Sequence, residues 1–192
     1  MKVFFAGASG VIGIRLIPLL VKAGHQVTAM TRTPSKTDLL RDLGADPVVC
    51  DVFDADALSE AVIAAGPDVI MSQITDLPDD VDSIGEFGAA NARIRREGTK
   101  NLLTAARAAG VDRFIAQSVA WTIPGNGGAA VEDMERAVFD AGGAIIRYGQ
   151  FYGPGTYYDE APPVGPTVHI DDAATRTVVV LVTNVTLLTV AD

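Results

Sequence analysis

The stretch Lys2-Val-Phe-Phe-Ala6, followed at once by Gly7-Ala-Ser-Gly10-Val-Ile-Gly13, decides the fold that this sequence predicts. The first five residues indicate a short buried strand. Apolar residues at helical spacing over residues 11–23 predict a helix directly after the turn, and residues 26–31 predict a second strand. Strand, glycine-rich turn, helix and strand together form the βαβ unit that holds a dinucleotide.

Each glycine of the turn has its own physical reason. Gly7 allows a tight turn out of the strand, Gly10 lets a pyrophosphate approach the backbone, and Gly13 lets the helix pack closely against the sheet. The N–H groups and the positive dipole end of the helix favour phosphate at the turn. The spacing GxxGxxG therefore predicts a dinucleotide site formed by Gly7, Ser9, Gly10, Val11, Ile12 and Gly13. The alternative is a turn of the same shape that binds no phosphate.

Composition limits the class of protein. The chain has 192 residues, 48% of them hydrophobic, and a formal net charge of −9. One domain with a sizeable core is expected, and the acidic balance argues against nucleic-acid and anionic-membrane partners. The single cysteine, Cys50, excludes an intramolecular disulfide and a cysteine metal cluster. The sequence shows neither a secretory leader nor an apolar run of membrane-spanning length, so a cytoplasmic protein is expected.

Strands and helices alternate through residues 1–150. Further strands are expected at residues 46–50, 68–72, 112–117 and 144–147, and further helices at 34–43, 54–65, 85–109 and 130–141, with a flexible turn at 125–128. This alternation predicts an α/β fold of Rossmann type, in which helices cover both faces of a doubly wound, mainly parallel sheet. Residues 1–150 would form the NAD(P)-binding part of this fold.

Residues 151–192 are expected to form a reduced C-terminal extension of the same compact unit. A loop rich in proline and glycine at residues 153–166 is a candidate lid, followed by a helix at 173–182 and a strand at 186–190. The tail is strongly apolar, so it either joins the sheet as a final strand or is covered by a partner. The second option predicts a homodimer.

The end of the second strand bears on the choice of cofactor. An NAD site usually has an acidic residue there, which binds the ribose 2′-hydroxyl. Here the sequence is Thr31-Arg-Thr-Pro-Ser-Lys36, without an acid, and Arg32 and Lys36 are suited to a 2′-phosphate. NADP is therefore expected, with NAD as the alternative, unless both cations are ordinary surface residues. Asp51, after the third strand, is expected beside the adenine ring or as a helix cap.

Six motifs in the same order resemble the short-chain dehydrogenase/reductase superfamily, on its extended or atypical side, the NAD(P)-dependent epimerase/dehydratase-like proteins. Besides the glycine-rich turn, they are residues 51–54 (DVFD), 97–106 (EGTKNLLTAA), 113–118 (RFIAQS), 146–155 (IRYGQFYGPG) and 168–174 (VHIDDAA). The match covers nearly the whole chain. It implies a nicotinamide cofactor and a small carbonyl or hydroxyl substrate. Further contacts to the cofactor are expected from Val52, Gln73, Ile74, Ser118 and Gln150.

The proton-transfer residues of that superfamily are missing. Its members use a tyrosine and a lysine four residues later, because a free tyrosine, with a pKa near 10, needs help to transfer a proton. Here no tyrosine precedes Tyr148, and Gly127 and Val131 stand near the expected positions. Ser118 is the first candidate for a catalytic hydroxyl and Tyr148 the second. The alternative for Ser118 is a strand-end serine bonded to backbone.

The sequence also predicts the positions of five other residues. Trp121 is either a substrate platform or a core aromatic, and His169 is expected in a structural or pocket-wall role. Asp171 is expected to cap the following helix. Arg95, with its neighbour Arg96, is expected on a solvated helix face.

Three functions fit these observations. The resemblance favours an NADP-dependent oxidoreductase or epimerase acting on a small molecule. The missing tyrosine and lysine favour a non-catalytic NADP(H)-binding redox sensor or regulatory protein. The third function is that of a non-redox isomerase or lyase using the same pocket.

Overall fold

Seven parallel strands form the central sheet of the computed structural model, which describes residues 1–78 and 80–192. The strand order is β3-β2-β1-β4-β5-β6-β9. The strands are β1 (Lys2–Ala6), β2 (Gln26–Thr31), β3 (Asp46–Val49), β4 (Val69–Ser72), β5 (Phe114–Val119), β6 (Ala144–Tyr148) and β9 (Leu187–Val190). Strands β2 and β3 are added on one side of β1, and β4 and the later strands on the other side. A doubly wound fold binds its ligands at this change in strand order, between β1 and β4. The predicted fold class is confirmed.

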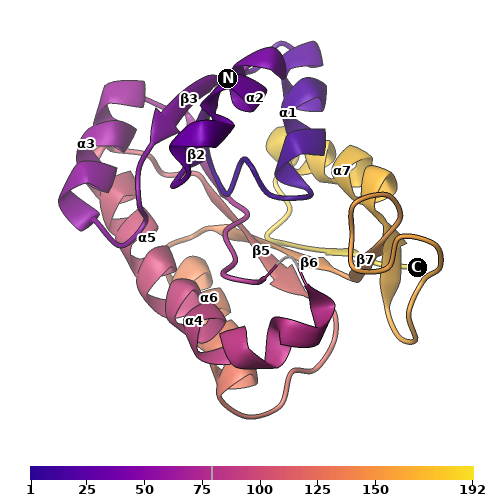
Figure 1. Ribbon diagram of the computed structural model, residues 1–192. Helices are drawn as coiled ribbons and strands as arrows, with labels where there is room; N and C mark the ends of the chain where they lie inside the picture. Colours follow the sequence, from indigo (N-terminus) through magenta and orange to yellow (C-terminus); the bar gives the residue numbers. More distant parts are fainter. Residues whose placement is uncertain (79) are drawn as a thin grey trace.

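Helices cover both faces of the sheet (Figure 1). On one face lie α1 (Gly13–Lys22), α2 (Thr37–Asp42) and α7 (Ile170–Val178), and on the other α3 (Ala55–Ala65), α5 (Thr99–Ala108) and α6 (Gly125–Asp140). Side chains alternate along β1 because its successive residues point to opposite faces. Val3 and Phe5 pack under the first group of helices, and Phe4 and Ala6 under the second.

The helix expected over residues 85–109 is present as four segments in a row. They are a 3₁₀ segment η2 (Val81–Phe87), α4 (Gly88–Arg93), a π-helical turn η3 (Ile94–Gly98) and α5. Gly98 lies where a Cβ atom would approach Ile74 to 3.0 Å and Val52 to 3.3 Å. A larger residue there would push this helix away from the loops that follow β3 and β4. Single π-helical turns inside α-helices are frequent at functional sites.

The flexible turn expected at residues 125–128 is wrong, because these residues form the first turn of α6. A Cβ atom on Gly128 would lie 2.0 Å from the carbonyl oxygen of Ile123, and one on Gly127 would lie 2.8 Å from the Ile123 side chain. The glycines therefore permit close packing at the start of the helix.

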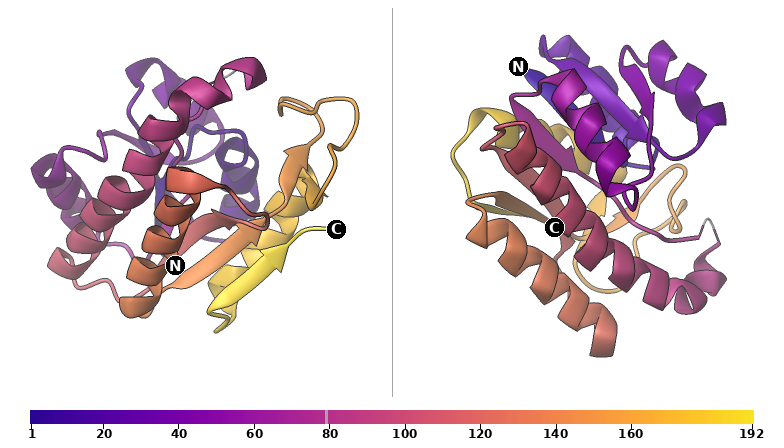
Figure 2. Two further views of the ribbon diagram at one scale, coloured as in Figure 1. Left: turned by 90° about the horizontal axis from the view of Figure 1, so that it is seen from below. Right: turned by 90° about the vertical axis from the view of Figure 1, so that its left-hand side faces the viewer.

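The C-terminal residues complete the sheet. Strand β9 pairs with β6 in parallel, with Leu187 opposite Ile145 and Val190 opposite Tyr148, at the sheet edge that Figure 2 shows in yellow. Between them, β7 (Gln150–Tyr152) and β8 (Thr167–His169) form a separate two-stranded sheet, and α7 is followed by the 3₁₀ segment η4 (Val179–Val182). The apolar tail thus joins the sheet, and a homodimer remains a prediction.

Helix α1 is tied to the C-terminal part of the chain, and Figure 1 shows α1 and α7 side by side. The guanidinium of Arg15 donates from Nε to Asp171 Oδ1 in α7 at 2.8 Å and from Nη1 to the carbonyl of Val11 at 2.9 Å. It also donates to the carbonyl of Pro154. In the part of the chain that the structure describes, no helix has the length and apolar character needed to cross a membrane.

Candidate functional site

A cavity of about 640 Å³ opens at the carboxyl ends of the central strands. Its walls come from the glycine-rich turn, the loops after β4 and β5, helix α4 and the C-terminal extension. The predicted residues that line it are Gly10, Val11, Ile12, Gln73, Ser118, Tyr148 and Gln150. This is the place where a doubly wound sheet binds ligands. The other predicted cofactor residues lie outside the lining of the cavity, namely Gly7, Ser9, Gly13, Thr31, Arg32, Lys36, Asp51, Val52 and Ile74.

The glycine-rich turn has the close approaches that its sequence predicts. Gly7 has a φ of 81°, and a Cβ atom on it would lie 2.5 Å from the carbonyl oxygen of Gln73. A Cβ on Gly13 would lie 2.3 Å from the carbonyl oxygen of Ala8. At Gly10 the nearest atom to a Cβ is the Gly7 oxygen, at 3.3 Å, so this residue lines the cavity without obstructing it.

Gln73 supplies the test of whether a dinucleotide fits here. Its side chain is 5% exposed, lines the cavity and donates from Nε2 to the hydroxyl of Tyr148 at 3.3 Å. Among the described residues, nothing donates to its Oε1 atom. A buried acceptor without a donor is costly, and a ligand hydroxyl or amide would satisfy it. The open face of Gly10 and this acceptor fit a nucleotide cofactor.

The end of β2 holds the predicted cofactor-selecting residues. Thr31 is buried, and its hydroxyl lies 3.1 Å from that of Ser9 in the glycine-rich turn. Arg32 is exposed and forms an ion pair with Asp76 in the loop after β4, with Nη2 2.8 Å from Oδ1. Lys36, in the 3₁₀ segment η1 (Pro34–Lys36), is exposed. The structure thus shows that Arg32, one of the two predicted 2′-phosphate ligands, is paired with the carboxylate of Asp76.

The predicted adenine side lies after β3. Asp51 is exposed, and its Oδ1 accepts from the backbone N–H of Phe53 at 3.0 Å. Asp54, not Asp51, caps α3, since its Oδ1 accepts from Ala57 N at 3.1 Å. The carbonyl of Val52 accepts from the side-chain amide of Asn101. Asp51 is therefore free of the capping function that was its alternative.

Ser118 and Glu135 are buried, and both belong to a polar cluster with the partly exposed Arg147. Its hydroxyl donates to Glu135 Oε1 at 2.5 Å, and the Arg147 guanidinium donates to both oxygens of Glu135, at 2.9 and 2.5 Å. Burial raises the pKa of Glu135, but the hydrogen bonds from Arg147 and Ser118 and the charges of Arg147 and Arg95 outweigh it and hold the pKa below its usual value. The hydroxyl hydrogen of Ser118 therefore points to a carboxylate and not into the cavity.

Tyr148, the second catalytic candidate, is 2% exposed. Thr177 donates to the carbonyl of Ala173 at 2.7 Å, so the Tyr148 hydroxyl, 2.6 Å from Thr177 Oγ1, donates to Thr177. Burial raises the pKa of Tyr148 well above its usual value, and the hydrogen bonds to Thr177 and Gln73 offset this only in part. The Tyr148 hydroxyl has a raised pKa and directs its proton to Thr177, so it is poorly placed to transfer that proton to a substrate.

Arg95 was expected on a solvated helix face, and that expectation is wrong. Its side chain is 6% exposed and lines the cavity. Its neighbour Arg96 points outward and pairs with Asp133 on α6, with Nε 2.7 Å from Oδ2. The sequence contains a signal for this difference, because Arg95 falls at helical spacing from Ala92 and Leu102, which are both buried.

The remaining aromatic and histidine residues divide between the cavity and the C-terminal extension. Trp121 lines the cavity, as do Tyr157 and Tyr158 from the loop after β7. His169 packs edge-on against Tyr152 and stands at the N-cap of α7, where its Nδ1 accepts from Asp171 N at 3.4 Å. The expected cap by Asp171 is wrong, because that residue lies inside the first turn.

Sequence comparison identifies relatives of this chain. The model of a family described as NAD(P)H-binding matches residues 7–146. A 3-diazoavenalumate denitrifying reductase from Streptomyces sp is 40% identical over 183 residues, which cover 82% of this chain and 59% of that protein. A 3-beta-hydroxysteroid dehydrogenase from Mycolicibacterium neoaurum is 34% identical over 116 residues, which cover 59% of this chain and 31% of that protein. The chain thus spans less than two thirds of the length of these curated relatives.

Solved structures share the fold. The UDP-glucose 4-epimerase from Thermus thermophilus, in complex with NAD, has a TM-score of 0.83 at 18% identity, covering 100% of this chain and 78% of that one. A short chain dehydrogenase from Burkholderia cenocepacia, in complex with NADP, has a TM-score of 0.78 at 17% identity, covering 100% of this chain and 88% of that one. At these identities the likeness concerns the fold alone.

Proposed function

This chain belongs to the NAD(P)H-binding family and has the fold of the short-chain dehydrogenase/reductase superfamily, and from that premise we propose that it is an NADPH-dependent reductase of a small molecule. The observation that carries the proposal is the cavity of about 640 Å³, which extends from the glycine-rich turn to the loop after β5. Its volume lies in the range of small-molecule sites. Part of the cavity would hold the nicotinamide end of the cofactor, and the rest would hold the substrate.

The cofactor would be held by residues on three loops. The backbone of the glycine-rich turn, with Gly10 at its open face, would face the pyrophosphate. Arg32 and Lys36 would face the 2′-phosphate of NADP, and Gln73 Oε1 would accept from a hydroxyl or amide of the bound cofactor. When bound, the reduced nicotinamide supplies a hydride.

The substrate would be one whose reduction needs no proton from a tyrosine. The chain has no tyrosine–lysine pair at the expected place, Gly127 lines the cavity with no side chain, and the Ser118 hydrogen is held by Glu135. A ketone reduced to an alcohol must take up a proton at oxygen. A substrate that loses a leaving group as it accepts hydride has no such requirement.

The name of the Streptomyces relative describes a reaction of this second kind. In the reductive removal of a diazonium group, the carbon gains a hydride while the carbon–nitrogen bond breaks. The electron pair of that bond leaves with dinitrogen, and no proton is consumed. We therefore propose that the substrates are electrophiles with a leaving group rather than carbonyl compounds. Diazonium compounds are the first of these to test. The cavity residues would orient the electrophile and keep water away from it.

Consumption of NADPH by the purified protein tests this function. A panel of arenediazonium salts and a matched panel of aromatic ketones would be supplied with NADPH deuterated at its transferable position. We expect deuterium in the arene product from the diazonium panel, well above the reaction without protein. A Gly10→Asp variant is the control, because a carboxylate at the open face of the turn repels phosphate.

Each other outcome has a definite meaning. Reduction of ketones alone would show a carbonyl reductase and refute the substrate order. NADPH binding without consumption of any substrate would favour the regulatory alternative, which the missing tyrosine and lysine support. Failure to bind NADPH or NADH would refute the function altogether.

A further inference from the structure

Arg95 is the one charged residue among the described residues that line the cavity. The other lining residues are apolar, aromatic or neutral and polar. The cavity therefore carries a positive charge in a protein whose formal net charge is −9. A neutral substrate would gain little from it.

The guanidinium of Arg95 has no hydrogen bond or ion pair among the described residues, although Arg95 is only 6% exposed. The acidic residue whose charge acts on it is Glu135, and that carboxylate already accepts from Ser118 and from Arg147. Arg95, Arg147 and Glu135 together carry a net charge of +1. Arginine stays protonated even when buried, and a buried charge normally has a partner. The structure leaves the partner of Arg95 to be supplied from the cavity.

Aromatic and aliphatic side chains form part of the walls of the cavity that Arg95 lines. Trp121, Phe151, Tyr157 and Tyr158 line the cavity, together with aliphatic residues such as Ile84. Aromatic side chains bind planar rings by stacking and edge contacts. The walls of the cavity therefore combine aromatic, aliphatic and neutral polar side chains with one positive charge.

We propose that Arg95 binds the carboxylate of the substrate, and that the substrates of this protein are planar aromatic or conjugated monocarboxylates. A guanidinium matches a carboxylate with two parallel hydrogen bonds, and one arginine neutralises one negative charge. A phosphate group on the substrate would carry about two negative charges, whereas the described lining residues offer one positive charge. The assignment rests on the proposed function, in which the cavity is the substrate site, and it names the substrate class that the function leaves open.

Binding of a matched pair of probes tests the assignment without any turnover. The probes are cinnamate and cinnamamide, which share a shape and differ in charge, and calorimetry measures both in the presence of saturating NADP⁺ and in its absence. We expect wild-type protein to bind cinnamate about 10-fold or more tightly than cinnamamide. Arg95→Met should lower the affinity for cinnamate by about the same factor and leave that for cinnamamide nearly unchanged.

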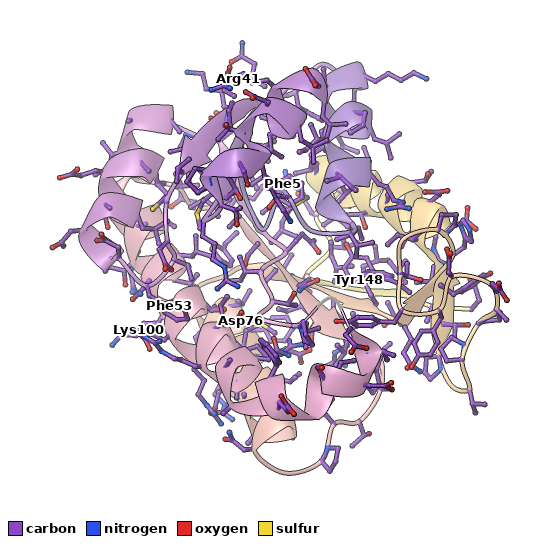
Figure 3. The ribbon with its side chains drawn as sticks, in the orientation of Figure 1. Phe5, Arg41, Phe53, Asp76, Lys100 and Tyr148 are labelled. Atoms are coloured by element: carbon purple, nitrogen blue, oxygen red, sulfur yellow. The ribbon has the colours of Figure 1, made fainter. Side chains whose placement is uncertain are left out.

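Two further variants make the result specific. Arg41→Met removes an exposed arginine on α2 that does not line the cavity and that lies apart from Tyr148 in Figure 3, so it should change neither affinity. Arg95→Lys keeps the charge without the two-pronged geometry, so it should restore part of the preference for cinnamate. If Arg95→Met does not fold, which a thermal melt reveals, the comparison of Arg95→Lys with wild type decides.

The outcomes separate this inference from the proposed function. Equal affinity for the two probes, equal loss of both in Arg95→Met, or no binding of cinnamate would each overturn the carboxylate site. Selective binding of cinnamate by a protein that binds NADPH and never consumes it would keep the carboxylate site and refute the reductase. Consumption of NADPH with uncharged substrates only would keep the reductase and refute the carboxylate site.

Discussion

Arg32 and Asp76 together decide how strongly the protein should prefer NADPH to NADH. If Arg32 binds the 2′-phosphate, Arg32→Ala removes hydrogen bonds to a charged group, each of which contributes about 1.5–3 kcal/mol. The affinity for NADPH should then fall by about 10- to 100-fold, since 1.4 kcal/mol is about a factor of ten. NADH has no 2′-phosphate, so its affinity should change by less than about threefold.

The ion pair seen between these residues sets the second part of the prediction. Arg32 must release Asp76 to bind a phosphate, and Arg32 is 57% exposed in its side chain. Asp76 is 17% exposed in its side chain, so the pair is only partly exposed. Exposed pairs are worth about 0–1 kcal/mol, and the upper end of that range applies here. Asp76→Asn should therefore tighten NADPH by up to about fivefold, and it should have no such effect in the Arg32→Ala background.

The assay is a pair of fluorescence titrations with NADPH and NADH, carried out on wild type, both single variants and the double variant at one fixed salt concentration. Lys36→Ala serves as a comparison for loss of a neighbouring positive charge. Equal losses of NADPH and NADH in Arg32→Ala would refute the assignment of the 2′-phosphate. A loss of NADH alone in Asp76→Asn would instead indicate that Asp76 binds a ribose hydroxyl.

Three predictions concern the surroundings of the site. Gly13→Ala should lower the free energy of unfolding by about 1–2 kcal/mol in urea titrations. The new Cβ atom would lie 2.3 Å from the carbonyl oxygen of Ala8, and the cost of this overpacking exceeds the gain of about 1 kcal/mol in helix propensity. Unchanged stability of the variant would contradict this. Glu135→Gln should lower the free energy of unfolding by about 1–3 kcal/mol at pH 7. Folding lowers the pKa of this carboxyl, so its charged form stabilises the protein above the pKa of the unfolded chain and loses that contribution as it is protonated. The difference in stability between variant and wild type should therefore shrink as the pH falls below about 4.5. A deficit that stays constant from pH 7 to about pH 3 would refute this origin. Tyr148→Phe should lower the melting temperature and cost about 1–2 kcal/mol, because Gln73 Nε2 loses its acceptor; an equally stable variant would mean that this hydrogen bond contributes nothing.

The sequence predicts the βαβ unit well because its signals are local. The strand, the three glycines and the helix lie within residues 2–23, and Gly7 and Gly13 each have a contact that only a missing side chain permits. The same local reasoning fails at residues 125–128, where four residues with two close glycine contacts form a helix start against Ile123. Glycine in sequence indicates freedom of the backbone, and only the packing around it distinguishes a flexible turn from a close approach.

The candidate site divides in the same way. Ser118 is found from its strand motif, but its hydrogen-bond partner Glu135 is 17 residues away and is chosen by how α6 packs on the sheet. Tyr148 is found from its motif, and only its partner Thr177, 29 residues away, shows that its proton is directed away from the cavity. Arg95 is missed, although helical spacing from Ala92 indicates its buried face, because charged residues are seldom fully buried.

The contact between α1 and α7 has a consequence for the order in which the protein folds. Arg15 and Asp171 are separated by 156 positions, so the helix that follows the glycine-rich turn stays uncovered on one side until most of the chain has been synthesised. Contacts between distant residues form slowly, since a long loop must close first. The side of α1 that packs against α7 in the finished protein therefore stays exposed to solvent until residues 170–178 have been made.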